Sequence, residues 1–162
     1  MAMALMMAAL GAKAQVTTNV RVGCGVITDN IGMTGLFQVN FPFLTGGAFT
    51  FSPSLEMDWA FGPSDWDEDI TSRNLSLPLQ LGYKVPIRGN LMFFPKVGPA
   101  VGYEFGDDVK DNFNIGPSVE LAFENKHFVG AIRGYYSVKG VKDYFGDDYA
   151  PYSVTLNVGC KF

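Results

Sequence analysis

The sequence predicts an all-β protein, an eight-stranded antiparallel transmembrane β-barrel preceded by a cleavable signal peptide. Three observations predict this fold: segments of alternating polarity recur between turn clusters, one face of these segments carries no charge, and long connections alternate with short ones. With 162 residues, 48% of them hydrophobic and 17% charged, the chain suits one domain with a sizeable apolar surface to cover. The net charge of −4 makes nucleic acid an unexpected partner.

The first segment, residues 1–14, has the pattern of a signal peptide. An apolar run is followed by the small-x-small triplet AKA at 12–14, so we expect cleavage after Ala14 and a barrel domain over 15–162. Because no basic residue precedes the apolar run, we expect the true start of the signal peptide to lie upstream. The run is too short to cross a bilayer as a helix.

Eight segments of alternating apolar and polar residues follow. Each is long enough to cross a bilayer as a tilted strand, which needs about 9 to 11 residues. In order along the chain, the segments are 17–27, 33–43, 49–61, 73–85, 90–105, 112–123, 127–138 and 152–162. The last one alternates up to the final Phe162. In a closed barrel such a terminal strand pairs with the first strand and leaves no open edge.

Several prolines fall inside these segments. Each removes a donor from the hydrogen-bond ladder, and prolines normally occur at sheet edges or bulges. Since a closed barrel has no edges, we expect bulges or bends at the five positions, Pro53, Pro78, Pro95, Pro99 and Pro117.

The two faces of the segments differ sharply in charge. One face is apolar throughout, as at Val20, Leu77 and Leu121, and the other carries five charges of each sign. On the outside of a membrane barrel a lysine or arginine would cost about 2 to 4 kcal/mol at the midplane, whereas paired charges inside are tolerated. We therefore expect an ionic network that fills a narrow lumen and leaves no bulk pore. Its members are Arg21, Glu56, Asp58, Lys84, Lys96, Glu104, Glu120, Glu124, Arg133 and Lys161.

The connections predict the orientation of the barrel. With both termini in the periplasm, the periplasmic turns are the tight ones at 45–48, 86–89 and 124–126. The extracellular connections are 28–32, which is short, and three longer acidic loops at 62–72, 106–111 and 139–151. Acidic and aromatic residues in these loops are candidates for binding a cation, a protein partner or a sugar, or else form a solvated rim with interface anchors. They are Asp65, Trp66, Asp67, Glu68, Asp69, Asp107, Asp108, Tyr144, Phe145, Asp147, Asp148 and Tyr149.

Four stretches carry a resemblance to a known family. They are FSPSLEMDW at 51–59, NLSLPLQLGYK at 74–84, PKVGPAVGYEF at 95–105 and VTLNVGCKF at 154–162. In this order and spacing the sequence resembles the small outer-membrane β-barrel proteins of Bacteroidetes type, related in kind to PorT-like and OmpX-like proteins. The resemblance implies an outer-membrane location and supplies no catalytic residues. The last segment also resembles the signal read by the outer-membrane assembly machinery, with Tyr152, Val158 and Phe162 as its main positions.

The residues that could carry chemistry are few. His127 follows a tight periplasmic turn, whereas a lipid-processing hydrolase needs a histidine beside a serine or an acid at the outer end, so we expect no enzyme. No cofactor or metal is expected. Cys24 and Cys160 lie on the first and last segments, where a disulfide needs Cα atoms within about 7 Å. Their register is doubtful, so we expect two free lipid-facing thiols.

The sequence leaves three functional hypotheses open. The first is a monomeric surface protein with a structural or adhesion-type role. The second is a PorT-like accessory of protein secretion or assembly, and the third is a soluble lipocalin-like carrier, which would need the apolar face inside. The expected partners are outer-membrane lipid and the assembly machinery, with an extracellular or secretion-system protein as a further partner.

Overall fold

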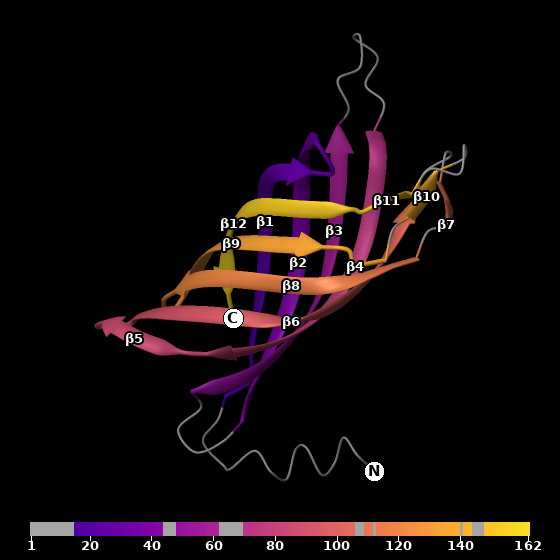
Figure 1. Cartoon of the computed structure of the whole chain (residues 1–162). Coiled ribbons are helices and arrows are strands. Elements are labelled where there is room, and N and C mark those ends of the chain that lie inside the picture. Colours follow the sequence, from indigo (N-terminus) through magenta and orange to yellow (C-terminus); the bar gives the residue numbers. More distant parts are fainter. Residues whose placement is uncertain are drawn as a thin grey trace.

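The computed structural model describes residues 15–43, 48–61, 70–105, 109–111, 113–139, 141–143 and 148–162. Within these residues eight long antiparallel strands form a closed barrel, so the predicted barrel fold is confirmed (Figure 1). The long strands are β1 (Thr17–Ile27), β2 (Asn30–Phe43), β3 (Phe49–Phe61), β4 (Ile70–Tyr83), β6 (Leu91–Phe105), β8 (Phe113–Glu124), β9 (Phe128–Tyr136) and β12 (Tyr152–Lys161). No helix in the described part of the chain is long and apolar enough to cross a membrane.

Two pairings close the barrel. β1 pairs with β12, with Val22 opposite Val158, and β4 pairs with β6 on the far side of the ring. At the last residue of the chain, the Phe162 amide donates to the Thr18 carbonyl over 2.8 Å, and the Thr18 amide donates to the Phe162 carbonyl over 3.0 Å. The first and last strands therefore lie side by side, as Figure 1 shows for β1 and β12.

The strands alternate between an exposed and a buried face. In β8 every second side chain, from Asn114 to Glu124, is buried, and the residues between them are exposed. A slip of one residue in any pairing would move a whole row of buried charges to the outside and bury the apolar row. The alternation that predicted the strands therefore also fixes their register.

The structure differs from the prediction at several connections. The first loop, expected over 28–32, is a two-residue turn at Thr28 and Asp29, both with positive φ (43° and 67°), and β2 begins directly at Asn30. This geometry matches the hairpin turn whose twist suits antiparallel strands, and the Asn30 side chain donates to the Thr28 carbonyl over 3.1 Å.

The turn expected at 86–89 lies in a different place in the structure. Residues Val85–Arg88 form the short strand β5, which pairs with the start of β6, and the chain turns at Gly89 and Asn90 instead. Gly89 has a φ of 57°, which glycine adopts without strain. We call the barrel end that carries this hairpin and the 125–127 connection the turn end, and the opposite end, with the 28–29 turn, the loop end.

Parts of the connections expected as loops also form strands. The short strands β7 (Val109–Asp111), β10 (Val141–Asp143) and β11 (Asp148–Tyr149) form a second sheet in the order β11-β10-β7. Their pairing joins the connection between β6 and β8 to the connection between β9 and β12. Local sequence alternation could not reveal this sheet, because its strands are only two or three residues long.

The register does not shift at the five prolines where bulges or bends were expected, although the ladder is interrupted beside Pro53 and Pro78. Pairing between β3 and β4 is interrupted between Pro53 and Glu56, yet the register is the same on both sides of the gap. Pro99 and Pro117 lie directly opposite each other in the β6–β8 pair, which also has no shift. Register shifts occur at 60/61, at 86/88, where Pro86 of the short strand β5 is involved, and at 142/143. Buried polar side chains flank these prolines, as Ser76 and Gln80 flank Pro78, and keep the register.

Candidate functional site

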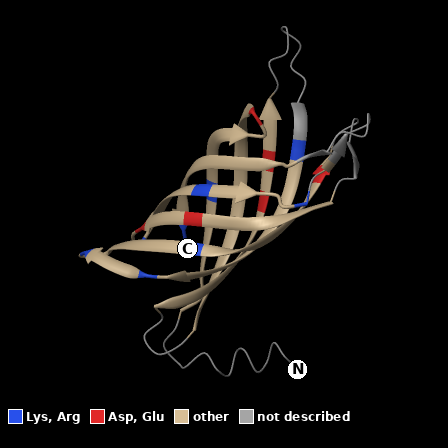
Figure 2. Ribbon diagram, viewed as in Figure 1, with Lys and Arg blue, Asp and Glu red and all other residues tan. Residues whose placement is uncertain are grey.

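The interior of the barrel is polar and charged. Small residues occupy many of the inward positions and leave room for a few long side chains, as Gly159 of β12 does opposite Arg21 of β1. Arg21, Glu120 and Arg133 are at most 1% exposed. Figure 2 shows that acidic and basic positions are spread over several neighbouring strands. This filling is the opposite of an ordinary apolar core.

One ion cluster is centred on Glu120 of β8. Its Oε2 lies 2.8 Å from Arg21 Nη2, and its Oε1 lies 2.6 Å from Lys96 Nζ. Gln38 Oε1 accepts hydrogen bonds from the same Lys96 ammonium over 2.6 Å and from Asn19 over 3.3 Å. Two cations therefore share one carboxylate and one amide oxygen, and the cluster joins β1, β2, β6 and β8 across the lumen.

A second cluster lies nearer the loop end. Arg133 Nη2 of β9 lies 2.8 Å from Glu56 Oε2 of β3. The hydroxyls of Thr34 and Ser76 donate to the two Glu56 oxygens, each over 3.3 Å. Neutral donors and one guanidinium thus solvate a carboxylate that is 2% exposed, which is the condition under which a buried charge is tolerated.

The turn end of the lumen combines a third ion cluster with an apolar group. Glu124 Oε1 lies 3.0 Å from Lys84 Nζ and 3.2 Å from Lys161 Nζ. The ring of Phe94, which is fully buried, lies 4.2 Å from Lys96 Nζ and packs with Ala122 and two further small apolar residues. A cation over a desolvated aromatic face is favourable by about 1 to 2 kcal/mol. Phe94 and the lysines therefore fill this end together.

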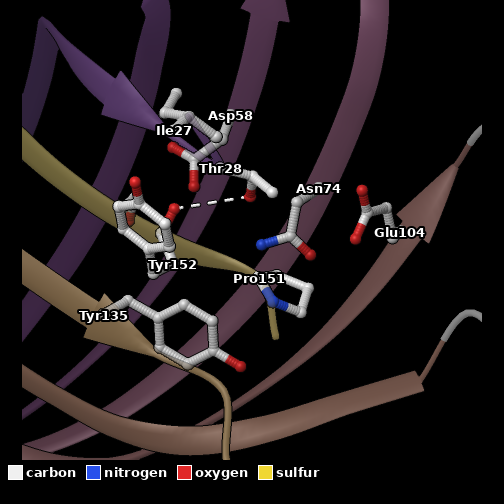
Figure 3. Close-up of a pocket in the computed structure, with 9 residues that line it drawn as sticks. Ile27, Thr28, Asp58, Asn74, Glu104, Tyr135, Pro151 and Tyr152 are labelled. Carbon is white, nitrogen blue, oxygen red and sulfur yellow. Dashed lines mark hydrogen bonds between the residues drawn. The ribbon is translucent and has the colours of Figure 1, made fainter. Parts of the chain in front are cut away.

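A small cavity remains at the loop end (Figure 3). It has about 10 Å³ of free space, about the room that one water molecule needs. Figure 3 shows Asp58, Asn74 and Glu104 on neighbouring strands along one side, with Tyr135 across from them. The Tyr135 hydroxyl donates over 2.6 Å to Asn114, whose own amide donates to Asn74 over 3.3 Å. The lining is completed by Ile27, Thr28, Pro151, Tyr152 and Ser153.

The structure places the ten charged residues of the expected network inside the barrel. Eight are buried, and the side chains of Lys84 and Lys161 are 16% and 14% exposed at the turn end. Sequence reasoning missed the neutral members, Gln38, Asn74, Asn114, Tyr135 and Phe94. Each of these lies on an inward position of its strand, so the alternation itself was the signal that could have found them.

Most of the loop candidates lie outside the described residues. These are Asp65, Trp66, Asp67, Glu68, Asp69, Asp107, Asp108, Tyr144, Phe145 and Asp147. Asp148 and Tyr149 form β11. Of the C-terminal positions, Val158 and Phe162 are exposed on the outside, and the Tyr152 hydroxyl donates to Asp29 over 2.7 Å. The residues of the predicted signal peptide, 1–14, are also outside the described part.

His127 and the cysteines have simple surroundings. His127 is exposed in the turn between β8 and β9, where its backbone amide donates to the Asn125 side chain over 2.8 Å. Cys24 and Cys160 are both exposed free thiols. Cys24 lies opposite Leu156 and Cys160 opposite Val20, so the two are four positions apart along the pairing, or about 13 Å. Within the described residues no group of three or more His, Cys, Asp or Glu could hold a metal ion.

The outer surface of the barrel is apolar between its two ends. The exposed charged side chains among the described residues lie at the ends of the barrel: Asp29, Arg73 and Lys139 at the loop end, Arg88 and Lys126 at the turn end. Exposed apolar residues between them include Val20, Val22, Met33, Phe37, Leu55, Leu77, Leu79, Leu81, Val97, Val119, Leu121, Ile132, Val154, Leu156 and Val158.

Aromatic rings gather at both ends of this apolar surface. At the turn end the Phe49 ring lies 4.8 Å from that of Tyr83, and the rings of Phe93 and Phe123 are 5.1 Å apart. At the loop end Tyr103 and Phe105 stack edge to face, with centroids 4.9 Å apart. The exposed Phe61, Phe113 and Tyr136 occupy the same end of their strands. The barrel thus carries two aromatic girdles around an aliphatic band.

Comparison with known proteins supports the fold. No protein-family model matches the sequence, and no curated protein matches it. Among solved structures, Neisserial surface protein A aligns with a TM-score of 0.57 and 10% identity over 91% of this chain and 96% of that one. A major outer membrane protein of Thermus thermophilus aligns with a TM-score of 0.52 and 13% identity, over 91% and 100%. The attachment invasion locus protein of Yersinia pestis, Ail, aligns with a TM-score of 0.50 and 11% identity, over 91% and 99%. The chain therefore has the fold of the small outer-membrane β-barrel proteins.

Proposed function

We propose that the protein is an integral outer-membrane β-barrel protein of the cell surface, with a structural or adhesion-type role. The observation that carries the proposal is the exposed aliphatic band between two aromatic girdles. Monomeric soluble proteins rarely expose contiguous apolar patches larger than a few hundred Å². Transmembrane barrels need such a band to contact lipid chains, and aromatic side chains prefer its two interfaces.

The height of the band fits a bilayer. Phe93 and Tyr103 mark the two girdles on β6 and are ten positions apart. Ten residues of a strand span about 33 Å, which becomes about 25 Å along the barrel axis at a tilt of about 40°. The outward apolar band of outer-membrane barrels is about 25 Å tall. Outer-membrane lipid is therefore the partner that this surface fits.

The filled interior argues for a surface role without bulk transport. Eight strands enclose a lumen that side chains just fill, and here three ion clusters and Phe94 occupy it. The cavity at the loop end has room for about one water. A lipocalin-like carrier would need a large apolar interior, so the charged interior speaks against that alternative.

The surface role rests on the loop end facing outward. Two of the similar proteins are named for the surface or for attachment, which supports an adhesion-type role at this end of the barrel. We further propose that the protein is a monomer and not an enzyme, and that the assembly machinery reads Tyr152, Val158 and Phe162. A PorT-like accessory role, proposed from the sequence resemblance, would require a stable secretion-system partner detectable by cross-linking.

Accessibility on intact cells tests the location and the orientation together. Single cysteines are introduced in a background that carries Cys24→Ala and Cys160→Ala. Val138→Cys places a thiol at the exposed loop end, and Lys126→Cys places one at the exposed turn end as its matched control. A membrane-impermeant maleimide should label position 138 on intact Gram-negative cells and position 126 only after lysis. Equal labelling of both on intact cells, or release of the protein with the soluble fraction, would contradict the proposal.

A further inference from the structure

Asp58 is one of the buried carboxylates at the loop end of the barrel. It is 2% exposed, and its Oδ1 has no hydrogen-bond partner among the described residues. It lines the loop-end cavity (Figure 3). A buried carboxylate oxygen without a partner costs free energy, because it has lost its water and gained nothing in exchange. We therefore expect the cavity to hold a group that stabilises the negative charge of the Asp58 carboxylate.

The strand register gathers oxygen ligands at this point. Asp58 of β3 lies directly opposite Asn74 of β4, and Asn74 lies directly opposite Glu104 of β6. Cβ atoms of directly opposed residues are about 4.5 to 5.5 Å apart, so the two carboxylates flank one amide on the concave inner wall. Thr28 adds a hydroxyl to the same cavity. Carboxylate, amide and hydroxyl oxygens are the ligands that hard cations prefer.

The charges nearby favour a cation over an anion or a neutral guest. Glu56 lies two residues from Asp58 on the same buried face of β3, and Arg133 already pairs with Glu56 at 2.8 Å. The carboxylates of Glu56 and Asp58 thus lie beside one guanidinium. The turn half of the lumen has the opposite balance, since Glu120 and Glu124 face Arg21, Lys84, Lys96 and Lys161. A cation at the loop end would balance the excess negative charge in the loop half of the lumen.

We propose that the loop-end cavity binds one small hard cation through oxygen ligands, with Asp58 as the anionic ligand at its centre. Asn74, Glu104 and Thr28 line the same cavity and supply its other side-chain oxygens. The cavity, with about 10 Å³ of free space, accepts a dehydrated ion and excludes an organic ligand. Calcium and sodium share this chemistry, and the experiment distinguishes them.

Cation titration of the folded barrel in detergent tests the proposal. Equilibrium dialysis with calcium gives the stoichiometry, and thermal unfolding followed by circular dichroism gives the stabilisation. Sodium is titrated separately, and a bulky organic cation takes its place at the lower sodium concentrations so that the ionic strength stays constant. Asp58→Asn removes the charge and keeps the shape, while Asp29→Asn is the matched control, because Asp29 is exposed at the same end and outside the cavity. A third variant neutralises the loop acids Asp65, Asp67, Glu68 and Asp69.

The expected result is one site per chain, with at least tenfold weaker binding in Asp58→Asn. Asp29→Asn and the loop variant should bind as the unmodified protein does. Without added cation Asp58→Asn should unfold at the same temperature or higher, which shows that the variant folds. A response to sodium alone that depends on Asp58 identifies the ion as monovalent. Absence of binding, binding that persists in Asp58→Asn, or binding that disappears only in the loop variant would overturn the proposal.

Discussion

Glu120 shows what a single interior residue does for this barrel. Its two carboxylate oxygens bind Arg21 and Lys96, both of which are buried with it. Replacing a complete buried ion pair with neutral groups can be nearly neutral, but removal of one partner leaves an uncompensated charge away from water. The cluster therefore stabilises the barrel only while all of its partners are present, and no single ion pair carries the effect.

We predict that Glu120→Gln lowers the free energy of unfolding by about 3 to 5 kcal/mol, because two cations lose their shared carboxylate. The double variant Glu120→Gln with Lys96→Met should cost less than the sum of the two single variants, since it removes a charge of each sign. Urea unfolding in lipid or detergent measures the free energy of unfolding of the two single variants and of the double variant. Strict additivity of the three values would show that the cluster does not act as a unit.

The interior glycines make a second prediction at the same scale. A Cβ at Gly82 would meet the Phe94 ring and lie 2.9 Å from the Pro95 carbonyl oxygen, whereas a Cβ at the outward Gly35 would lie 3.5 Å from the Trp59 ring. Gly82→Ala should therefore destabilise the barrel by about 1 to 3 kcal/mol through overpacking. Gly35→Ala should change stability by no more than about 0.5 kcal/mol. Equal effects, measured by the same unfolding assay, would refute the proposed packing around Phe94.

Phe94 also shows where sequence reasoning reached its limit at this scale. The alternation assigned the charged residues to one face because a charge is excluded from the other. The alternation places Phe93 in the apolar outward row and therefore Phe94 in the inward row with Lys96, but an aromatic ring was not expected among interior charges. Gln38, Asn74 and Tyr135 were missed for a related reason. The alternation places them on the inward face, but a role for these uncharged side chains is visible only in their contacts across the lumen.

At the scale of the elements, the sequence predicted the long strands well and their ends less well. The ranges of β1 and β3 agree fully, while β2 and β4 each begin three residues earlier than expected. Hydrophobic alternation fades at the barrel ends, where side chains leave the apolar band. At the five prolines the ladder is interrupted only beside Pro53 and Pro78 and the register does not shift, because register is a property of paired strands and cannot be seen in one strand alone.

The pairing of β1 with β12 gives a direct test at this scale. Cys24 and Leu156 are directly opposite and both exposed, so their Cα atoms lie within the range of about 4.4 to 6.8 Å that a disulfide needs. Leu156→Cys with Cys160→Ser should form an intramolecular disulfide in the folded barrel with a membrane-permeant oxidant. The unmodified pair, Cys24 and Cys160, should stay reduced under the same conditions. Mass spectrometry after alkylation distinguishes the two states, and the reverse result would mean that the register is wrong.

At the scale of the whole molecule, an inverted distribution of polarity accounts for the fold and carries the proposed function. Charges are inside, an aliphatic band is outside, and the band is bounded by aromatic girdles. In water this arrangement would expose the band, and in a bilayer it buries the band against lipid. Closure of the sheet completes the arrangement, because every backbone edge within the membrane needs a partner.

A pair of arginine substitutions on β6 tests the position of the bilayer. Val97 is exposed near the middle of the band, and Leu91 is exposed at the turn end beyond Phe93. Val97→Arg should lower the stability of the barrel in lipid by about 2 to 4 kcal/mol, and Leu91→Arg by about 0 to 1 kcal/mol. Unfolding in lipid vesicles measures the difference. Similar values for the two variants would argue against a membrane centred on this band.

The central claim, a closed barrel that spans a membrane, is tested most directly by heat-modifiability. The chain from Gln15 onward is refolded in detergent, and boiled and unboiled samples are compared by gel mobility alongside circular dichroism. The account predicts a shifted band in the unboiled sample, a strand-rich spectrum and no folding in plain buffer. A protein that folds in plain buffer and shows no mobility shift would contradict the membrane barrel.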